Sequence, residues 1–298
     1  MATLYTEQSK NIRKTWTLVF VFLIVVISVG YFISLYYGRP DILLFAVVFA
    51  LGMNIFAYWN SSKMVLKMSG AKKASREEYF DLYTLTENLA ITAGLPMPQL
   101  YVIHDDAPNA FATGRNEKHA VVAVTTGLLS LLEKDELEGV VAHELAHIGN
   151  KDMLISTMVV VLVGFITLLS DFFLRSLLFR GRGRDSDSQL GSIFMIVGIA
   201  LMILAPIIGI LIQLSISRKR EYLADASGAL LTRYPDGLAN ALEKISHYGG
   251  KMKIQNKAIA HLFISNPFGA KKSLSGISKM FSTHPPLQER VQRLRKEM

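Results

Sequence analysis

The sequence contains no cysteine and few charged residues. Only 19% of its 298 residues are Asp, Glu, Lys or Arg, whereas soluble domains carry about 25%. Without cysteine there is neither a disulfide framework nor a thiolate metal site, so only histidine and carboxylate could hold a zinc ion. Apolar residues make up 51% of the chain, and its mean hydropathy is +0.32. This balance excludes a disordered chain and argues against a fully cytosolic enzyme.

Four runs free of charged residues are long enough to cross a membrane. A helix rises 1.5 Å per residue, so roughly 20 residues cross a hydrocarbon core of ~30 Å. The runs are 16–37, 42–59, 153–170 and 193–216. The first run is longer than the apolar region of a signal peptide, and no small-residue cleavage site follows it. We therefore expect an integral membrane protein with two helical hairpins, the first retained as an anchor.

Basic residues flank the first hairpin on both sides. They are Lys10, Arg13, Lys14, Lys63, Lys67, Lys72, Lys73 and Arg76, against Arg39 alone in the turn. The positive-inside rule then places both flanks in the cytoplasm. The net charge of +8 thereby fits an anionic membrane surface better than a nucleic acid. The second hairpin is less clear, because its tip (179–190) is rich in arginine; an interfacial hairpin, or one packed on the soluble domain, stays open.

The remaining sequence predicts a mostly helical catalytic domain with a small β-sheet. Apolar spacing and caps favour helices over 76–93, 134–150, 218–234, 236–248 and 286–298. Val-rich segments favour strands over 99–104 and 119–125, with a short extended or edge segment at 109–114. Residues 249–279 look loosely structured. The chain accordingly divides into a membrane hairpin (1–60), a first catalytic part (61–152), a second hairpin (153–217) and a second catalytic part (218–298).

One motif carries the chemistry. His143-Glu144-Leu145-Ala146-His147 lies within a predicted helix. The i, i+4 spacing puts both imidazoles on one helix face, where they can present two nitrogens to a tetrahedral Zn²⁺. Glu144 follows the first ligand and can reach the attacking water rather than the metal. The pattern indicates a zinc-dependent peptidase.

Two histidines do not complete a zinc site, so a third ligand is required. The candidates include carboxylates and the histidines His119, His247, His261 and His284. Glu221 stands out because Asp225 lies one turn further along the same helix face, where it could accept a proton from a ligand imidazole. An equally good interpretation pairs Glu221 with its neighbours Arg218, Lys219 and Arg220. Spacing alone leaves both open.

The ordered set of motifs resembles the HtpX-type membrane zinc endopeptidases, gluzincins related to the CAAX-prenyl-protein proteases. The resemblance runs through His143–His147, Gly149–Asp152, the hairpin that follows and Glu221–Asp225. It also includes the NAFATG segment at Asn109–Gly114 and the STHPP segment at Ser282–Pro286. It covers nearly the whole chain; the arginine-rich tip of the second hairpin is the visible departure.

The resemblance implies a role for each matching residue. His143, His147 and Glu221 would bind one Zn²⁺ per chain, with Glu144 as catalytic base and Asp225 behind a ligand. An edge strand along the NAFATG segment would hold the substrate through Asn109, Ala110, Phe111 and Ala112. His284 matches a histidine that stabilises the transition state in such sites. The local sequence fits equally well a loop histidine that is held rigid by the two prolines after it.

The expected function is therefore cleavage of misfolded or damaged proteins at the cytoplasmic face of a bacterial inner membrane. Its partners would be unfolded proteins and the lipid bilayer; nothing in the sequence indicates the oligomeric state. Two alternatives remain: a membrane adaptor without turnover, and a processing protease with a single substrate. A degenerate adaptor would be expected to lose Glu144 or a ligand, and this chain has kept them all.

Overall fold

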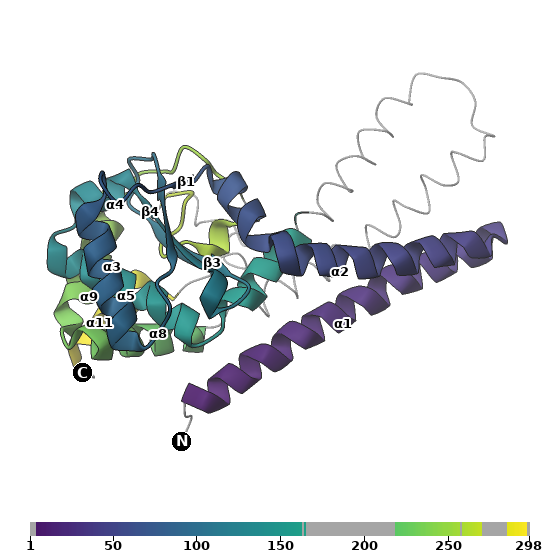
Figure 1. The fold of residues 1–298 in the computed structure, drawn as a ribbon, viewed down its shortest axis with the longest axis horizontal. Helices are drawn as coiled ribbons and strands as arrows, with labels where there is room; N and C mark the ends of the chain where they lie inside the picture. Colours follow the sequence, from purple (N-terminus) through teal and green to yellow (C-terminus); the bar gives the residue numbers. More distant parts are fainter. Residues whose placement is uncertain (1–3, 163, 165–217, 257, 270–284, 297–298) are drawn as a thin grey trace.

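The computed structural model describes residues 4–162, 164, 218–256, 258–269 and 285–296. The predicted span 193–216, residues 163 and 165–170 of the predicted span 153–170, the arginine-rich tip and His284 lie outside these residues. Figure 1 shows a rounded domain from which two long helices project side by side.

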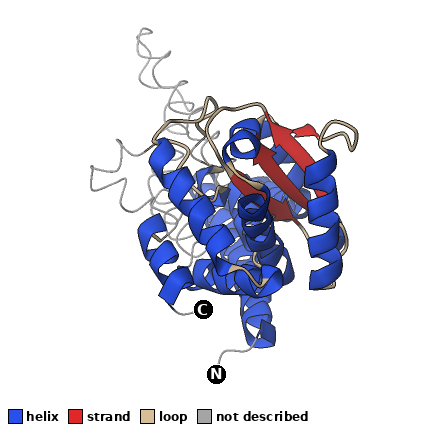
Figure 2. Cartoon of the chain, turned by 90° about the vertical axis from the view of Figure 1, so that its left-hand side faces the viewer, coloured by secondary structure: helices blue, strands red, loops and turns tan. Residues whose placement is uncertain are grey.

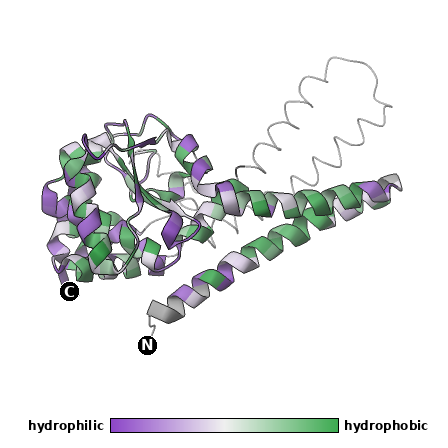
Figure 3. Ribbon diagram, viewed as in Figure 1, coloured by the Kyte–Doolittle hydropathy of each residue, from purple (hydrophilic) through white to green (hydrophobic). Residues whose placement is uncertain are grey.

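These two helices form the predicted first hairpin. α1 (Leu4–Tyr37) and α2 (Pro40–Ser69) are joined at Gly38, whose φ of 62° is left-handed, and Pro40 begins α2 with its backbone angle already set. Segments Asn11–Phe32 and Pro40–Ser69 are long and apolar enough to cross a membrane. Large apolar side chains such as Phe20, Phe45 and Ile55 are exposed along both helices, as expected for a surface that faces lipid (Figure 3).

The third predicted run begins with a helix that packs against this hairpin. Residues 153–162 are helical and bent by 81° from the preceding helix α5 (Lys134–Gly149). Met158 and Leu162 are buried against Leu18 of α1 and Ala57 of α2. Among the described helices there are thus two candidate spans, or three if the bent pair counts as one. The prediction of four membrane spans is therefore confirmed only in part.

A four-stranded mixed sheet forms the centre of the domain (Figure 2). Its strands are β1 (Lys72–Lys73), β2 (Gln99–Ile103), β3 (Ala110–Gly114) and β4 (Ala120–Thr125), in the order β1-β2-β4-β3. β2 and β4 are parallel, whereas β3 pairs antiparallel with β4, with Ala112 opposite Val122. The predicted strands are confirmed, and segment 109–114 does supply an edge strand.

Helices cover one face of the sheet, and the predicted helices are confirmed with small shifts at their ends. They are α3 (Phe80–Ala93), α4 (Thr126–Leu131), α5, α8 (Arg218–Thr232), α9 (Pro235–Tyr248) and α11 (Leu287–Lys296), with 3₁₀ turns at Glu117–His119 and Ala260–Leu262. α5 is central, because it packs on α3, α8, α9 and β3. Residues 76–79 form turns rather than the start of α3.

Two glycines let neighbouring helices approach α5 closely. A Cβ on Gly139 would lie 2.5 Å from the backbone nitrogen of Leu238 in α9. A Cβ on Gly228 of α8 would lie 3.0 Å from the backbone nitrogen of His143. A side chain at either position would force the helices apart, so α8 and α9 lie directly on the helix that carries the His-Glu-x-x-His motif.

The stretch after α9 is more ordered than its composition predicts. Within its described part, Met252, Ile259 and Phe263 are buried against Phe111 and other residues on the sheet face opposite α5. The interpretation of 249–279 as loosely structured is wrong for these residues, because scattered apolar side chains give no periodic pattern yet still fill a sheet face.

Candidate active site

Three potential metal ligands converge between α5 and α8. The Nε2 atoms of His143 and His147 lie 3.1 Å apart. The Glu221 carboxylate oxygens lie 3.6 Å from Nε2 of His147 and 3.8 Å from Nε2 of His143. A tetrahedral zinc site with ligand bonds of about 2.0–2.1 Å has ligand atoms about 3.3 Å apart. The three donors are therefore close enough to one another to hold a metal ion such as zinc.

The Nδ1 atom of each histidine, on the side of the ring away from the other ligands, contacts a carboxylate. Nδ1 of His143 lies 3.0 Å from Asp225, and Nδ1 of His147 lies 3.1 Å from Asp152. An Nδ1–H donated to a carboxylate fixes the tautomer and leaves Nε2 free for a metal. Asp225 lies where the sequence predicts. Asp152 was not singled out, although a carboxylate just after the end of α5 is the available signal.

Arg290 is a further member of this site that no sequence pattern predicts. Its side chain is fully buried, and its Nε and Nη2 donate to the two Asp225 oxygens at 2.9 and 2.6 Å. Nη1 lies 3.6 Å from Glu221. Burial alone would raise the pKa of Asp225, but Arg290 and His143 outweigh it and hold the pKa at about 2. Arg290 thus keeps Asp225 charged and fixed.

The two histidines respond to opposite electrostatic surroundings. Burial and the nearby Arg290 charge lower the pKa of His143 to about 4, so this ring is neutral and able to bind a metal. Burial also disfavours a charged His147, yet Asp152, Glu221 and Glu144 overcome this effect and raise its pKa to about 10. The carboxylates around His147 therefore favour positive charge here, and a divalent cation can supply it in place of the proton.

Glu144 lies beside the cluster as a buried carboxyl group. Its side chain is 2% exposed, and burial raises its pKa to about 7. The backbone N–H of Ala112 in β3 faces this carboxyl group and favours its charged form. A group with this pKa can both take and release a proton near neutral pH, as a general base must.

The four residues predicted to hold a substrate lie along β3, but they do not face the same way. Ala112 directs its backbone toward Glu144. The side chain of Phe111 lies on the opposite sheet face, against Phe263 at 5.1 Å between ring centroids. Asn109 is 1% exposed. Its side-chain amide accepts a hydrogen bond from the backbone N–H of Ser265 and donates one to the Ser265 carbonyl.

The chain itself closes the outer edge of β3 at Ala110. The backbone N–H of Ile264 donates to the Ala110 carbonyl at 2.9 Å. Phe263 lies on one sheet face and Ile264 on the other, so the chain wraps round the strand at this point. The rest of the strand, from Ala112 to Gly114, lies beyond this contact and is buried as well.

Three other histidines considered as ligands lie elsewhere in the described part of the chain. His119 contacts Asn116 and Arg115, His247 contacts the Glu243 carbonyl, and His261 contacts the Ser156 carbonyl. Among the described residues, the cluster of potential ligands contains Glu221 as its third member.

Comparison with known proteins agrees with this geometry. Residues 77–298 match Peptidase family M48. A "Protease HtpX homolog" of Caldanaerobacter subterraneus is 44% identical over 298 residues, covering 98% of this chain and 97% of that protein. Another, from Thermoanaerobacter pseudethanolicus, is 45% identical with the same coverage.

A solved structure matches the fold. The crystal structure of S. mikatae Ste24p aligns with a TM-score of 0.51 over 97% of this chain and 67% of that one, at 19% identity. This likeness concerns the fold alone. From the family match over most of the chain and the HtpX relatives over nearly its full length, we conclude that the chain belongs to peptidase family M48, as a membrane-associated metalloprotease of the HtpX type.

Proposed function

We propose that this protein is a zinc-dependent endopeptidase that cleaves unfolded or misfolded proteins, membrane proteins among them, at the cytoplasmic face of a bacterial inner membrane. The observation that carries the proposal is the convergence of His143, His147 and Glu221 beside the buried Glu144. Two imidazoles and one carboxylate suit zinc, one ion per chain. The basic flanks of the first hairpin support the cytoplasmic orientation.

Several residues of the site have separate roles in the proposed peptide hydrolysis. A bound zinc ion would polarise the peptide carbonyl and lower the pKa of a water molecule. The Glu144 carboxylate takes a proton from the attacking water and then passes it to the nitrogen of the leaving amine. Asp225, Asp152 and Arg290 keep the ligands oriented. His284, in the STHPP segment, would stabilise the transition state.

The substrate is proposed to lie extended along the outer edge of β3. An edge strand binds a peptide through backbone hydrogen bonds, which recognise little side-chain identity. Broad cleavage of unfolded segments follows, and this suits quality control under stress. A dedicated processing enzyme would instead show one defined cleavage motif, and an adaptor would show no cleavage.

The test is cleavage of an unfolded model protein in detergent with added Zn²⁺, with the full chain compared with Glu144→Gln. We expect only the wild type to cleave and a chelator to stop it, while both proteins bind one zinc ion. If both bind zinc and neither cleaves, the metal is structural and the adaptor interpretation gains. A survey of unrelated unfolded substrates separates broad cleavage from the processing alternative.

A further inference from the structure

The two tryptophans of the chain lie at one level along the helical hairpin. Trp16 in α1 and Trp59 in α2 are 67% and 57% exposed. At 1.5 Å per residue, each helix covers about 30–33 Å between its tryptophan and the turn at Gly38. This length matches a hydrocarbon core of about 30 Å, at whose surfaces tryptophan side chains collect. Trp16 and Trp59 therefore mark the level of the lipid head groups nearest the catalytic domain.

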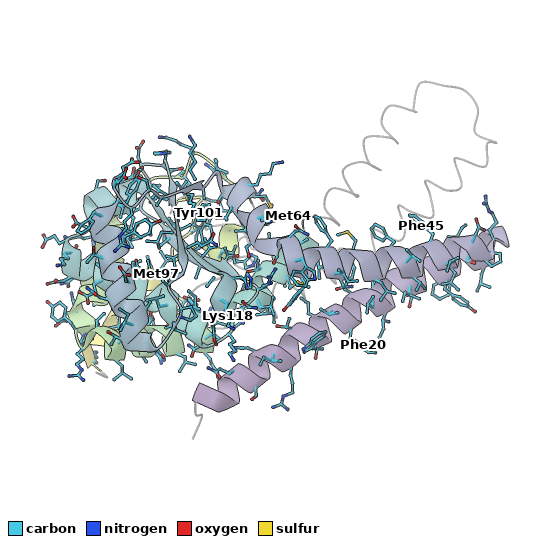
Figure 4. The ribbon with its side chains drawn as sticks, in the orientation of Figure 1. Phe20, Phe45, Met64, Met97, Tyr101 and Lys118 are labelled. Atoms are coloured by element: carbon cyan, nitrogen blue, oxygen red, sulfur yellow. The ribbon has the colours of Figure 1, made fainter. Side chains whose placement is uncertain are left out.

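The end of α2 that follows Trp59 belongs to the catalytic domain. Figure 4 shows Met64 beside the domain and Phe45 on the projecting part of the same helix. Val65, one residue after Met64, is buried against Phe111 of β3. Because this end of α2 is part of the domain core, Trp59 has a fixed position relative to the domain.

Arg115, in the turn after β3, reaches Trp59 from the domain. Its guanidinium lies over the indole ring, 4.3 Å from the ring centroid, in a cation–π contact. Nη2 lies 2.7 Å from Nε2 of His119, and Nδ1 of that imidazole lies 2.7 Å from Oδ1 of Asn116. An amide oxygen only accepts, so His119 donates through Nδ1–H and its Nε2 accepts from Arg115. A neutral imidazole thus orients the guanidinium without cancelling its charge.

The positive charge of Arg115 has no carboxylate partner among the residues that the structure describes. The acidic residue nearest to it along the chain, Glu117, is paired with Lys151 at 3.5 Å. The printed contacts of the guanidinium are the neutral ring of His119 and the face of Trp59. Arg115 is therefore an oriented cation that lacks an anion.

Two lysines add to this charge. Lys118 follows Arg115 by three residues, and Figure 4 shows it on the side of the domain toward α1 and α2. Lys63 follows Trp59 by one helical turn, so their side chains lie on the same face of α2. Both lysines are exposed, and neither forms an ion pair with another described residue.

A phosphodiester with a net negative charge fits this arrangement. A guanidinium whose face is covered by an aromatic ring still presents N–H groups in its plane, where they can meet two oxygens of one phosphate. Lipid phosphates lie at the level of the tryptophans, and lysine side chains next to the bilayer attract anionic lipids. A zwitterionic head group carries its own cation and therefore complements the three basic residues less well.

From these contacts we propose that Arg115, Lys118 and Lys63, together with Trp59, bind the head group of an anionic phospholipid where α2 enters the catalytic domain. The bound lipid would connect the turn after β3 to α2 and so fasten the domain to the membrane surface. The proposal concerns membrane attachment and is independent of the peptidase function.

The test measures which lipid contacts Trp59. In the Trp16→Phe variant of the full chain, Trp59 is the only tryptophan, so its fluorescence is quenched by brominated acyl chains next to it. The protein is placed in phosphatidylcholine nanodiscs that contain the same fraction of either brominated phosphatidylglycerol or brominated phosphatidylcholine. We expect Trp59 to favour phosphatidylglycerol at least about fivefold, the effect of one basic residue near an anionic surface. Equal quenching by the two lipids would overturn the proposal.

Two double variants in the Trp16→Phe background distinguish a site from general charge attraction. Arg115→Gln with Lys118→Gln should remove most of the preference for phosphatidylglycerol. Arg295→Gln with Lys296→Gln removes the same charge from α11, on the side of the domain away from the projecting hairpin (Figure 1), and should keep the preference.

A preference that survives the loss of Arg115 and Lys118, or that falls equally in both double variants, contradicts the proposal. Thermal unfolding shows whether each variant is folded. If a double variant does not fold, the comparison of the two lipids in Trp16→Phe alone decides, because it needs no change at the site.

Discussion

At the scale of single residues, the protonation of Glu144 sets the acid side of the pH profile. Burial raises the pKa of this carboxyl group to about 7, and as a base it works only when ionised. A bound cation beside it favours the ionised form and brings its pKa part of the way back toward the ordinary value of about 4.3.

Activity should therefore fall as pH drops, with the midpoint of the acid limb of kcat/KM between about 4.5 and 7. The measurement is initial rates over pH 4–9 on an unfolded substrate at saturating zinc, with zinc content determined at each pH. A midpoint at or below 4.5 with zinc still bound would show that Glu144 is not the group that titrates.

Arg290 is a positioning residue whose effect depends on its shape as well as its charge. Its planar fork meets both oxygens of Asp225, and lysine cannot reproduce this bidentate geometry. Arg290→Lys should lower kcat/KM by about 10–100-fold, which is the typical effect of losing a residue that orients a metal ligand. Initial rates and zinc affinity, measured in parallel, check this.

Removal of the Arg290 charge isolates the second part of its role. Arg290→Met leaves the charge of Asp225 buried without its arginine partner, which costs about 3–5 kcal/mol. The double variant with Asp225→Asn should recover most of that stability but not the activity. Arg295 is exposed on the same helix as Arg290 and is paired with Glu243 of α9, so Arg295→Ala is the control variant. Equal losses from Arg290→Lys and this control would contradict the positioning role.

At the scale of elements, the site depends on how closely α8 lies against α5. Glu221, Asp225 and Gly228 follow one another on one face of α8, and a Cβ on Gly228 would come within 3.0–3.2 Å of backbone atoms of Ala142 and His143. Gly228→Ala must therefore move α8 outward by a few tenths of an ångström, taking Glu221 with it.

We expect Gly228→Ala to weaken zinc binding by about tenfold, comparable to the loss of an outer contact. Helix propensity alone would make Gly228→Ala stabilising, since alanine favours a helix by about 1 kcal/mol over glycine. A loss of zinc affinity would therefore come from the displacement of α8 and not from a weaker helix. Zinc competition with a chromophoric chelator measures the effect. Gly52→Ala in α2, where a Cβ meets nothing within 4 Å, is the control. Unchanged zinc affinity in Gly228→Ala would show that a Cβ is accommodated between α8 and α5 without displacing Glu221.

What the sequence could predict at this scale was local. The i, i+4 spacing of His143 and His147 and the capped apolar pattern of α5 are properties of one helix, so they are visible in the sequence. β1 is two exposed lysines, which show no strand pattern and form a strand only because β2 lies beside them. Arg290 reaches the site through tertiary packing, and no local pattern distinguishes it from a solvated charge. Asp152 lies five residues after His147, so its position just after α5 is a local signal.

At the scale of the whole molecule, the metal would join two parts of the chain that the sequence separates. His143 and His147 precede the segment 153–217, and Glu221 follows it. The outer contacts have the same distribution, with Asp225 and Arg290 both after the segment. A cation held by α5 and α8 therefore fastens the two catalytic parts to each other, in addition to the packing between the helices.

Metal removal should accordingly destabilise the folded protein as well as stop cleavage. A ligand present at 100 times its Kd stabilises the native state by about 2.7 kcal/mol, which corresponds to about 5–10 °C in Tm for a domain of this size. Thermal unfolding in detergent, with and without a chelator, measures the shift. Glu144→Gln should show the full shift, because it is inactive but keeps every ligand. Glu221→Ala should start from a lower Tm and respond little to the chelator, since the link to α8 is already lost. If Glu221→Ala responds as strongly as the wild type, the ion is held by α5 alone, and the two catalytic parts are joined by packing without the metal.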